Sequence, residues 1–301
     1  MTWYSVHGRK SEVRVWPSKF LRKNEHLLYI LPTTIFLISL VIFPFIYSLF
    51  ISFTRFSLAE FTYRFVGLQN YAATLRDQRF LVALKNTVVF VALVVAVEFF
   101  AGLAMALLLN RQIKGGRYFM ILFIIPMMIS PIVSGTIWRL LFDVDVGPIN
   151  YVLGAIGFST VAWITSTATS LISVAIVDFW QNTPFMMLVL LAGLQSLPNE
   201  PYEAALVDGA SRWKVFRYIT LPMLRPIIAA AILIKLMDAF KTFDVVYILT
   251  YGGPGTSSEV LSFTIYSYGF LYLDLGYASA LSYILLAIVM LLSTQVIRRL
   301  G

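Results

Sequence analysis

Residues 86–109 read Asn-Thr-Val-Val-Phe-Val-Ala-Leu-Val-Val-Ala-Val-Glu-Phe-Phe-Ala-Gly-Leu-Ala-Met-Ala-Leu-Leu-Leu, an apolar stretch with one ionisable residue, Glu98. A helix of about 20 apolar residues crosses the hydrocarbon core of a bilayer, which is about 30 Å thick. Other stretches that meet this criterion lie at about 28–54, 118–141, 170–194, 222–249 and 278–298. The sequence therefore predicts an all-α, polytopic membrane protein with about six transmembrane helices.

The composition of the whole chain supports this prediction. Of 301 residues, 59% are hydrophobic and 13% are charged, whereas soluble domains carry about 25% charged residues. The chain has no cysteine, which excludes disulfides, thiolate metal sites and a catalytic cysteine. Its two histidines, His7 and His26, lie near the N-terminus, which disfavours a histidine metal centre. The net charge of +8 comes from Lys and Arg at the ends of apolar stretches, so we interpret it as a topology signal rather than as a nucleic-acid-binding surface.

The Lys and Arg residues also predict an orientation. They occur in the N-terminal segment, in the connections 110–117 and 195–221 and at the C-terminus, whereas 142–169 and 250–277 contain none. The connection 55–85 is basic as well, but it is outweighed by these two loops, which lack Lys and Arg. Lys and Arg favour the cytoplasmic side, so both termini and the 195–221 loop are predicted to be cytoplasmic. Residues 1–27 lack the apolar core of a signal peptide and are predicted to form a cytoplasmic tail before a transmembrane domain, 28–301.

Prolines within two of the predicted spans indicate bends. Pro126 and Pro131 lie in the third span and Pro184 lies in the fourth. Each proline removes a backbone hydrogen bond that lipid cannot replace. We therefore expect these helices to be kinked and to pack against other helices.

A polar island, residues 199–222, separates the fourth and fifth predicted spans. Pro201 suits the first turn of a helix, and the Glu-Ala-Ala-Leu segment from Glu203 favours helix formation. Gly209 is expected to end or bend this helix, after which a second short helix begins near Arg212. Two short helices joined at a glycine would form a knob on the cytoplasmic side. An amphipathic connector that lies on the lipid surface is the alternative interpretation.

The island resembles the EAA loop of ABC importer permeases, which has Glu-Ala-Ala, a Gly four residues later and then Ile-x-Leu-Pro. The matching residues are Glu203, Ala204, Ala205, Gly209, Ile219, Leu221 and Pro222. Other segments are similar to the sugar-importing branch of this family, of the maltose or glycerol-phosphate permease type. They are Phe65–Tyr71, Gly147–Asn150, Trp180–Met186 and Phe243–Pro254.

This resemblance implies an ABC type I importer permease fold and a set of partner chains. The implied partners are a second related permease, a dimer of ATP-binding subunits and an extracytoplasmic solute-binding protein, in a bacterial or archaeal plasma membrane. The chain lacks a Gly-x-x-x-x-Gly-Lys-Ser/Thr segment, so ATP and Mg are expected on the partner ATPase, with no cofactor and no catalysis in this chain. The resemblance implies that the ATPase contacts Glu203, Ala204, Ala205, Asp208, Gly209, Leu221 and Pro222.

Ionisable residues inside predicted spans give two further hypotheses. Lys235, Asp238, Lys241 and Asp244 follow one another at three-residue steps, which on one helix would let Lys235 pair with Asp238 and Lys241 with Asp244. Alternatively, these residues line a polar translocation path. Glu98 has no evident partner nearby in sequence, so a bond to another helix or subunit is expected.

A sugar path requires hydrogen-bonding groups and aromatic faces, which the fourth and fifth predicted spans offer. The candidate path residues are Asp178, Trp180, Gln181, Asn182, Lys235, Asp238 and Thr242. The sequence leaves open whether the substrate is neutral or anionic. A secondary, ion-coupled transporter of small polar solutes is the main alternative function, although no inverted repeat supports it. An integral membrane enzyme and a homomeric channel are disfavoured, because no catalytic constellation or selectivity-filter repeat is present.

Overall fold

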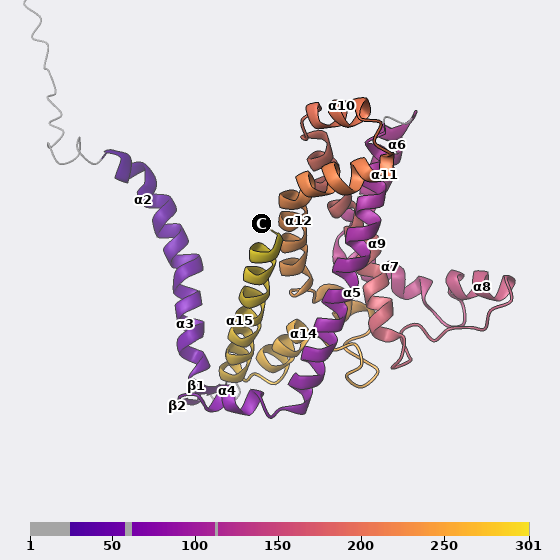
Figure 1. The fold of residues 1–301 in the computed structure, drawn as a ribbon. Coiled ribbons are helices and arrows are strands. Elements are labelled where there is room, and N and C mark those ends of the chain that lie inside the picture. Colours follow the sequence, from indigo (N-terminus) through magenta and orange to yellow (C-terminus); the bar gives the residue numbers. More distant parts are fainter. Residues whose placement is uncertain (1–24, 58–61, 112–113, 301) are drawn as a thin grey trace, which may run out of the picture. The chain divides into compact units, whose positions relative to one another are not determined.

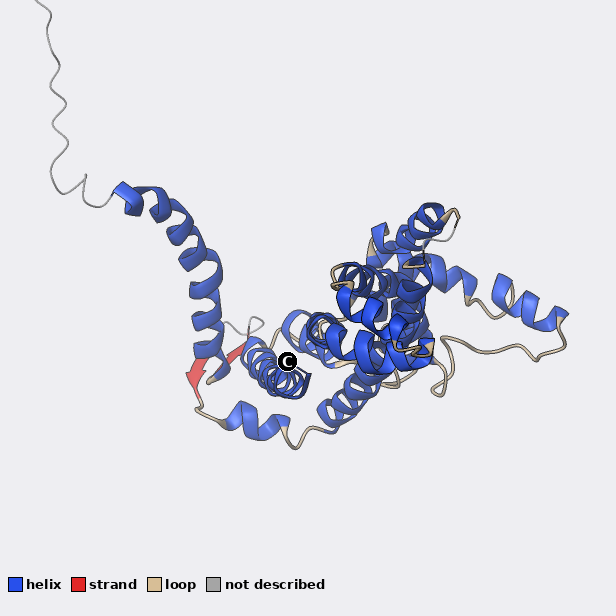
Figure 2. Ribbon diagram, turned by 45° about the horizontal axis from the view of Figure 1, so that its top comes forward, coloured by secondary structure: helices blue, strands red, loops and turns tan. Residues whose placement is uncertain are grey.

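The computed structural model describes residues 25–57, 62–111 and 114–300. Helices dominate these residues, and the described strands are one antiparallel pair, β1 (Thr54–Ser57) and β2 (Thr62–Phe65). Figure 2 shows this pair in red beside the blue helices. The predicted tail, 1–27, lies almost wholly outside the described residues. The predicted helical membrane fold is confirmed, with a small hairpin that the apolar pattern did not indicate.

The chain forms two compact units, Met1–Phe50 and Ile51–Gly301. In the first unit, α2 (Glu25–Leu37), η1 (Ile38–Ile42) and most of α3 (Phe43–Ser52) follow one another as a long apolar helix. Large side chains of this helix, such as Phe36 and Phe43, are at least 60% exposed. Such an apolar surface is suited to lipid rather than to water.

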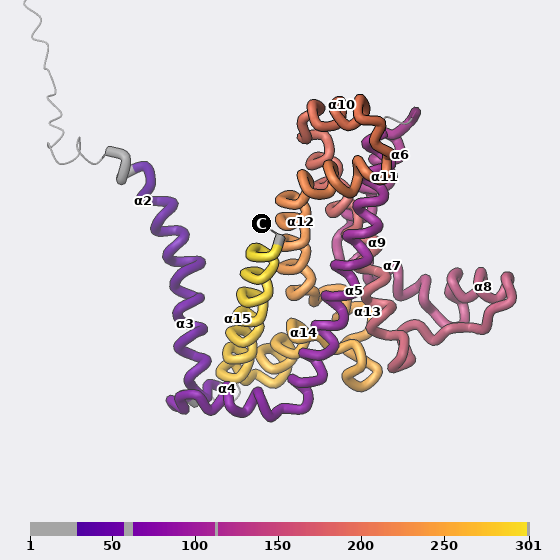
Figure 3. Tube along the Cα trace, in the orientation of Figure 1, coloured from indigo at the N-terminus to yellow at the C-terminus, as the bar shows by residue number. Residues whose placement is uncertain are grey.

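Five helices among the described residues are long and apolar enough to cross a membrane. One is Tyr29–Ser52, and the others belong mainly or wholly to the second unit. They are α5 (Gln78–Leu109), α9 (Ser170–Gln195), the segment α11–η3–α12 (Arg212–Val215, Phe216–Thr220, Leu221–Ala239) and α15 (Leu275–Leu300). Figure 3 follows these helices along the chain, from α5 to the C-terminal α15. α9 continues past Pro184 as one helix.

The third predicted span is broken where its prolines lie. α6 (Gly116–Ile124) and η2 (Ile125–Met128) form one arm, α7 (Pro131–Leu141) forms the other, and the two arms meet at 97°. Ser130 is extended, with ψ of 139°, because a residue that precedes proline avoids the helical region. The predicted bend is therefore confirmed.

The fifth predicted span, 222–249, is shorter than expected. α12 ends at Ala239, residues 240–243 turn, and a separate short helix, α13 (Asp244–Leu249), packs against α7. The turn is closed by backbone bonds from Lys241 N to Asp238 O and from Thr242 N to Ala239 O. The Thr242 carbonyl, freed from the helix, accepts the hydroxyl of Ser262. The expected three-residue stripe therefore does not run along a single helix.

Close helix packing forms the core of the second unit. α5 and α9 pack along much of their length, and a Cβ atom on Gly102 of α5 would lie 2.8 Å from the Met186 side chain of α9. Glycine at this position allows the two backbones to approach. α12 packs against both helices, and its buried Leu224 and Ile228 join the same apolar cluster as Met186.

The remaining short elements lie toward the two ends of the helix bundle. α10 (Glu200–Val207) and α11 lie near the end of α5 and the beginning of α6, at the end that carries the connections predicted to be cytoplasmic (Figure 1). At the opposite end lie α4 (Gln69–Thr74) and α14 (Leu261–Tyr266), which is followed by η4 (Ser267–Leu271). α8 (Pro148–Ala155) belongs to the loop between α7 and α9.

Candidate functional site

A buried cluster of charges joins three membrane helices. Lys235 of α12 is 1% exposed, and its Nζ lies 2.7 Å from Asp178 Oδ2 of α9 and 3.0 Å from Glu98 Oε1 of α5. Asn182, one turn after Asp178, donates its amide to Asp178 Oδ1 at 3.1 Å. A charge in a low-dielectric interior is tolerated when it is paired, so this cluster ties the three helices together.

This geometry corrects the predicted pairing of Lys235 and confirms that Glu98 contacts another helix. Lys235 pairs across helices with Asp178 and Glu98, not along its own helix with Asp238, because it faces the helix core. Within the described ranges, no ion pair joins Lys241 to Asp244, because the turn at 240–243 separates them. The expected bond of Glu98 to another helix is present. The sequence could not specify this partner, since residues 98 and 235 are far apart in the chain.

A polar cavity of about 310 Å³ lies beside the charge cluster. Its wall is formed by the middle of α9, the end of α12, the turn that follows it and the break between α6 and α7. The path residues predicted from the sequence that line this cavity are Asp178, Gln181, Asn182, Asp238 and Thr242. The cavity therefore offers carboxylates, amides and a hydroxyl within one space.

Two of the predicted path residues lie elsewhere. Lys235 lines a neighbouring cavity of about 220 Å³ together with Asn182 and Asp238. The ring of Trp180 packs edge-on against Trp138 of α7, with centroids 5.7 Å apart, and it does not line the larger cavity. Sequence reasoning missed Met127 and Ile129, which reach the cavity because of the proline break. The Ile129 carbonyl accepts a hydrogen bond from the Gln181 side-chain amide at 2.7 Å. Pro126 and Pro131, which flank this break in the helix, were the sequence signal that could have identified it.

The polar island forms two short helices, as expected. α10 begins at Glu200 and ends at Val207, and Gly209 follows with a φ of +67°, in the left-handed region that glycine adopts without strain. Ala210 N donates to Ala205 O at 2.9 Å, which closes the end of the helix. Ser211 caps α11 by accepting from Lys214 N at 3.4 Å. The Tyr202 hydroxyl donates to Thr220 Oγ1 at 3.1 Å and so connects α10 to η3.

We call residues 199–222 the coupling loop, after the role that the resemblance implies for it. Ala205 of α10 is 6% exposed, whereas Leu206 and Val207 are 81% and 88% exposed. Of the residues that the resemblance assigns to ATPase contact, those exposed are Glu203, Ala204, Asp208, Gly209 and Pro222, while Leu221 is half-buried. Two neighbouring apolar side chains exposed at a polar end of the helix bundle are typical of a surface that another protein covers.

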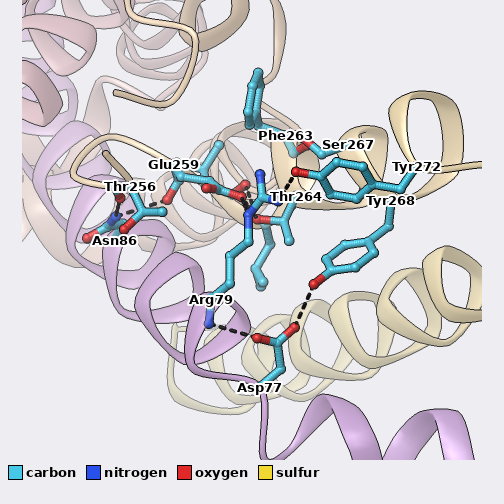
Figure 4. Close-up of polar contacts among 12 residues, drawn as sticks. Asp77, Arg79, Asn86, Thr256, Glu259, Phe263, Thr264, Ser267, Tyr268 and Tyr272 are labelled. Carbon is cyan, nitrogen blue, oxygen red and sulfur yellow. Dashed lines mark hydrogen bonds and ion pairs between the residues drawn. The ribbon is translucent and has the colours of Figure 1, made fainter. Parts of the chain in front are cut away.

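The opposite end of the bundle carries a denser polar network, in which residues 250–274, here called the outer loop, bind the start of α5 (Figure 4). Arg79 Nε pairs with Glu259 Oε1 at 2.7 Å, and Arg79 Nη1 donates to the Tyr272 hydroxyl at 2.7 Å. Glu259 is 2% exposed and also accepts from Thr264 Oγ1 at 2.8 Å. Asn86 donates to the Thr256 and Glu259 carbonyls at 2.9 and 3.0 Å.

Asp77, the residue that caps α5, completes this network. Its Oδ1 accepts from Arg79 N at 2.8 Å, and its Oδ2 accepts the Tyr268 and Tyr277 hydroxyls, both at 2.9 Å. Partial burial alone would raise the pKa of Asp77, but the hydrogen bonds from the two tyrosines and from backbone amides lower it overall. Burial and the neighbouring Asp77 carboxylate raise the pKa of Tyr268 to about 12, so Tyr268 remains a donor. The many aromatic residues of the outer loop did not indicate, from the sequence, that Tyr268 and Tyr277 bind Asp77.

Comparison with known proteins agrees with this architecture. Residues 98–300 match the family described as binding-protein-dependent transport system inner membrane component. A probable ABC transporter permease protein, y4oQ of Sinorhizobium fredii, is 38% identical over 97% of this chain and 94% of its own length. The trehalose/maltose transport system permease protein MalF of Thermococcus litoralis is 37% identical over 93% of this chain and 94% of its own.

Another relative and a solved structure extend the comparison. The sulfoquinovosyl glycerol transport system permease protein SmoG of Agrobacterium fabrum is 33% identical over 93% of this chain and 92% of its own. A chain of a bacterial alginate ABC transporter, crystallised with an alginate pentasaccharide-bound periplasmic protein, has a TM-score of 0.80 at 24% identity. That alignment covers 94% of this chain and 96% of the other, and at this identity it establishes the fold. The chain belongs to the family of binding-protein-dependent transport system inner membrane components and is a multi-pass ABC transporter permease.

Proposed function

We propose that this permease forms half of the translocation path of an ATP-driven importer for a sugar or sugar derivative. The observation that carries this proposal is the polar cavity beside the charge cluster. Sugars present many hydroxyl groups, each of which needs a donor or an acceptor when water is removed. Asp178, Asn182 and Asp238 supply both kinds of group on one wall. The trehalose/maltose and sulfoquinovosyl glycerol systems of its relatives support a sugar-like substrate.

The charges at the cavity favour an uncharged substrate. Asp238 and Asp244 lie on its wall with one lysine, Lys241, while the third carboxylate, Asp178, is paired with Lys235. The other lysine, Lys235, is buried and engaged by Asp178 and Glu98, so it is not free to bind an anionic group. An anionic sugar would face an excess of carboxylates, which repel it in a low-dielectric environment. We therefore infer a neutral sugar or polyol.

Energy would reach the cavity through the coupling loop. The Glu203–Gly209 segment, which is exposed except at Ala205, is suited to docking as a short helix in a groove of a separate ATP-binding subunit, which would bind ATP and Mg. A second, related permease would complete the path, and a solute-binding protein would deliver the sugar from outside. Movement is transmitted only if the docked contact differs between the two states of the ATPase.

The cavity can be tested by sugar uptake into proteoliposomes that contain the permease with its partner subunits. Asp238→Asn replaces an acceptor oxygen by a donor, and Asn182→Ala removes an amide. Each is expected to raise the half-saturating sugar concentration about tenfold. Thr294→Val is the matched control, because Thr294 is exposed and its hydroxyl bonds only its own helix, at Leu291 O. Unchanged uptake in both cavity variants would contradict the proposed path. Uptake driven by a proton gradient without ATP would instead indicate an ion-coupled carrier.

A further inference from the structure

A further cavity lies at the base of the coupling loop, outside the polar path proposed for the sugar. It has a volume of about 590 Å³ and lies between the end of α5 and the segment 202–220. Arg111 contributes from beyond α5, and Arg212 contributes from the start of α11. The rest of the wall is mainly apolar or aromatic. We call this cavity the arginine pocket and define it by Leu107, Arg111, Tyr202, Arg212, Trp213 and Phe216.

Both arginines lie at the ends of apolar spans. The span Gln78–Leu109 ends two residues before Arg111, and the span Arg212–Ala239 begins at Arg212. The ends of apolar spans mark the level of the lipid headgroups. Trp213, which is 66% exposed, and Tyr202 are of the type that gathers at this level, because their rings are apolar and carry a polar group.

The two guanidinium groups are also without a carboxylate partner within the described ranges. The ion pairs among the described residues involve Arg79 and Lys235. Neither Arg111 nor Arg212 forms one with these residues. The carboxylates of α10, Glu200 and Glu203, lie more than 4.0 Å from both guanidinium groups. Two cations from separate elements therefore flank an open, largely apolar space.

We propose that the arginine pocket binds an anionic phospholipid of the cytoplasmic leaflet. The phosphate would lie between Arg111 and Arg212, and an acyl chain would lie along Trp213 and Phe216. Basic cavities between membrane helices on the cytoplasmic side are suited to such headgroups. The apolar wall favours a lipid over free phosphate, and the position at the ends of two spans favours a lipid over a soluble peptide. The bound lipid would brace the base of the coupling loop.

The test is native mass spectrometry of the full-length permease, purified with its partner subunits and stripped of lipid. The sample is titrated with phosphatidylglycerol, and phosphatidylcholine serves as the uncharged comparison. The native protein is expected to retain one more phosphatidylglycerol per chain than the double variant Arg111→Gln/Arg212→Gln. The affinity at this site should fall at least ~10-fold in that variant, because each arginine contributes to headgroup binding.

Two further double variants control for a general effect of lost positive charge. Arg298→Gln/Arg299→Gln removes the same charge from exposed residues at the C-terminal end of α15 and should leave the retained lipid unchanged. Arg111→Lys/Arg212→Lys should restore part of the binding if charge is what the lipid recognises. Equal retention by the native protein and the glutamine variant would overturn the proposal. So would displacement of the lipid by inorganic phosphate, or a lipid adduct that appears only after the ATPase is removed.

Discussion

The outer loop and the coupling loop are similar in length, yet they differ in how far their apolar side chains are exposed. In the outer loop, Val260, Leu261 and Phe263 are at most 3% exposed, and its polar groups bind α5. In the coupling loop, Leu206 and Val207 are more than 80% exposed. Around Val260 the outer loop is packed by its own chain, although its Phe270 is 71% exposed, whereas the coupling loop leaves both Leu206 and Val207 uncovered. This difference indicates where a partner subunit is needed.

The largest loss of stability is expected from a charge placed among the buried side chains of the outer loop. Leu261 is 1% exposed in the outer loop, and Leu261→Asp would place an unpaired carboxylate in an apolar cluster. We expect a loss of about 4 kcal/mol or more, enough to remove most folded protein. The measurement is the yield of monodisperse complex by size-exclusion chromatography.

The matched substitution in the coupling loop is Leu206→Asp. Leu206 is 81% exposed, so its folded yield should match that of the native protein, while co-purification of the ATPase should fall sharply. If both aspartate variants lost the same fraction of folded protein, the contrast between the two loops would be wrong.

A smaller effect is expected from the ion pair that holds the outer loop. Glu259→Ala removes the buried acceptor of Arg79 and Thr264 and leaves the partly exposed guanidinium with the Tyr272 hydroxyl but without its carboxylate partner. We expect a loss of about 2–3 kcal/mol, less than for a fully buried pair, because Arg79 retains contact with water. Thermal unfolding followed by tryptophan fluorescence measures the change. Asp145→Ala, at an exposed residue of another loop, should alter stability by less than about 0.5 kcal/mol.

The tyrosine contacts of Asp77 should contribute less again. Tyr268→Phe removes one of two hydroxyl donors to Asp77 Oδ2 and should cost about 1 kcal/mol at neutral pH. The pKa of folded Asp77 lies below its ordinary value, so the ionised carboxylate stabilises the fold above about pH 4. This contribution is lost as the pH falls through the folded-state pKa. The difference between Tyr268→Phe and the native protein should therefore shrink in acid, and a constant difference would argue against this hydrogen bond.

The smallest change in global stability is expected at Gly209. Its φ of +67° favours glycine, and Gly209→Ala should cost about 1 kcal/mol within the coupling loop alone. Because this loop is exposed, the midpoint of thermal unfolding should be unchanged within error. ATP hydrolysis stimulated by the binding protein and sugar should nevertheless fall several-fold. An alanine variant with native stimulation would show that the geometry after α10 is unimportant for coupling.

The sequence predicted the parts of this fold that depend on local pattern. The apolar stretches located the spans, the prolines at 126 and 131 predicted the bend, and Gly209 marked the end of α10. The sequence did not predict the turn at 240–243, because apolar residues continue through both sides of it. That turn moves Asp244 onto a separate helix and brings it to the cavity wall.

The sequence could not predict contacts between site residues that lie far apart in the chain. The pairing of Lys235 with Glu98 and Asp178 depends on how α5, α9 and α12 pack, which hydropathy does not encode. The same holds for Asp77 with Tyr268 and Tyr277, where each residue alone resembles an ordinary interfacial residue. Of the predicted path residues, Trp180 satisfied the composition expected of a sugar site but packs against Trp138.

The central claim, that the coupling loop transmits work from an ATPase, is tested most directly in proteoliposomes that contain the complete complex. ATP hydrolysis and sugar uptake would be measured for the native permease and for the Glu203→Lys/Gly209→Asp variant. Our account predicts that the variant permease folds and reaches the membrane but loses ATP-coupled uptake and releases the ATPase. Native rates of ATP-coupled uptake in the variant would contradict it and would leave α10 as a surface helix.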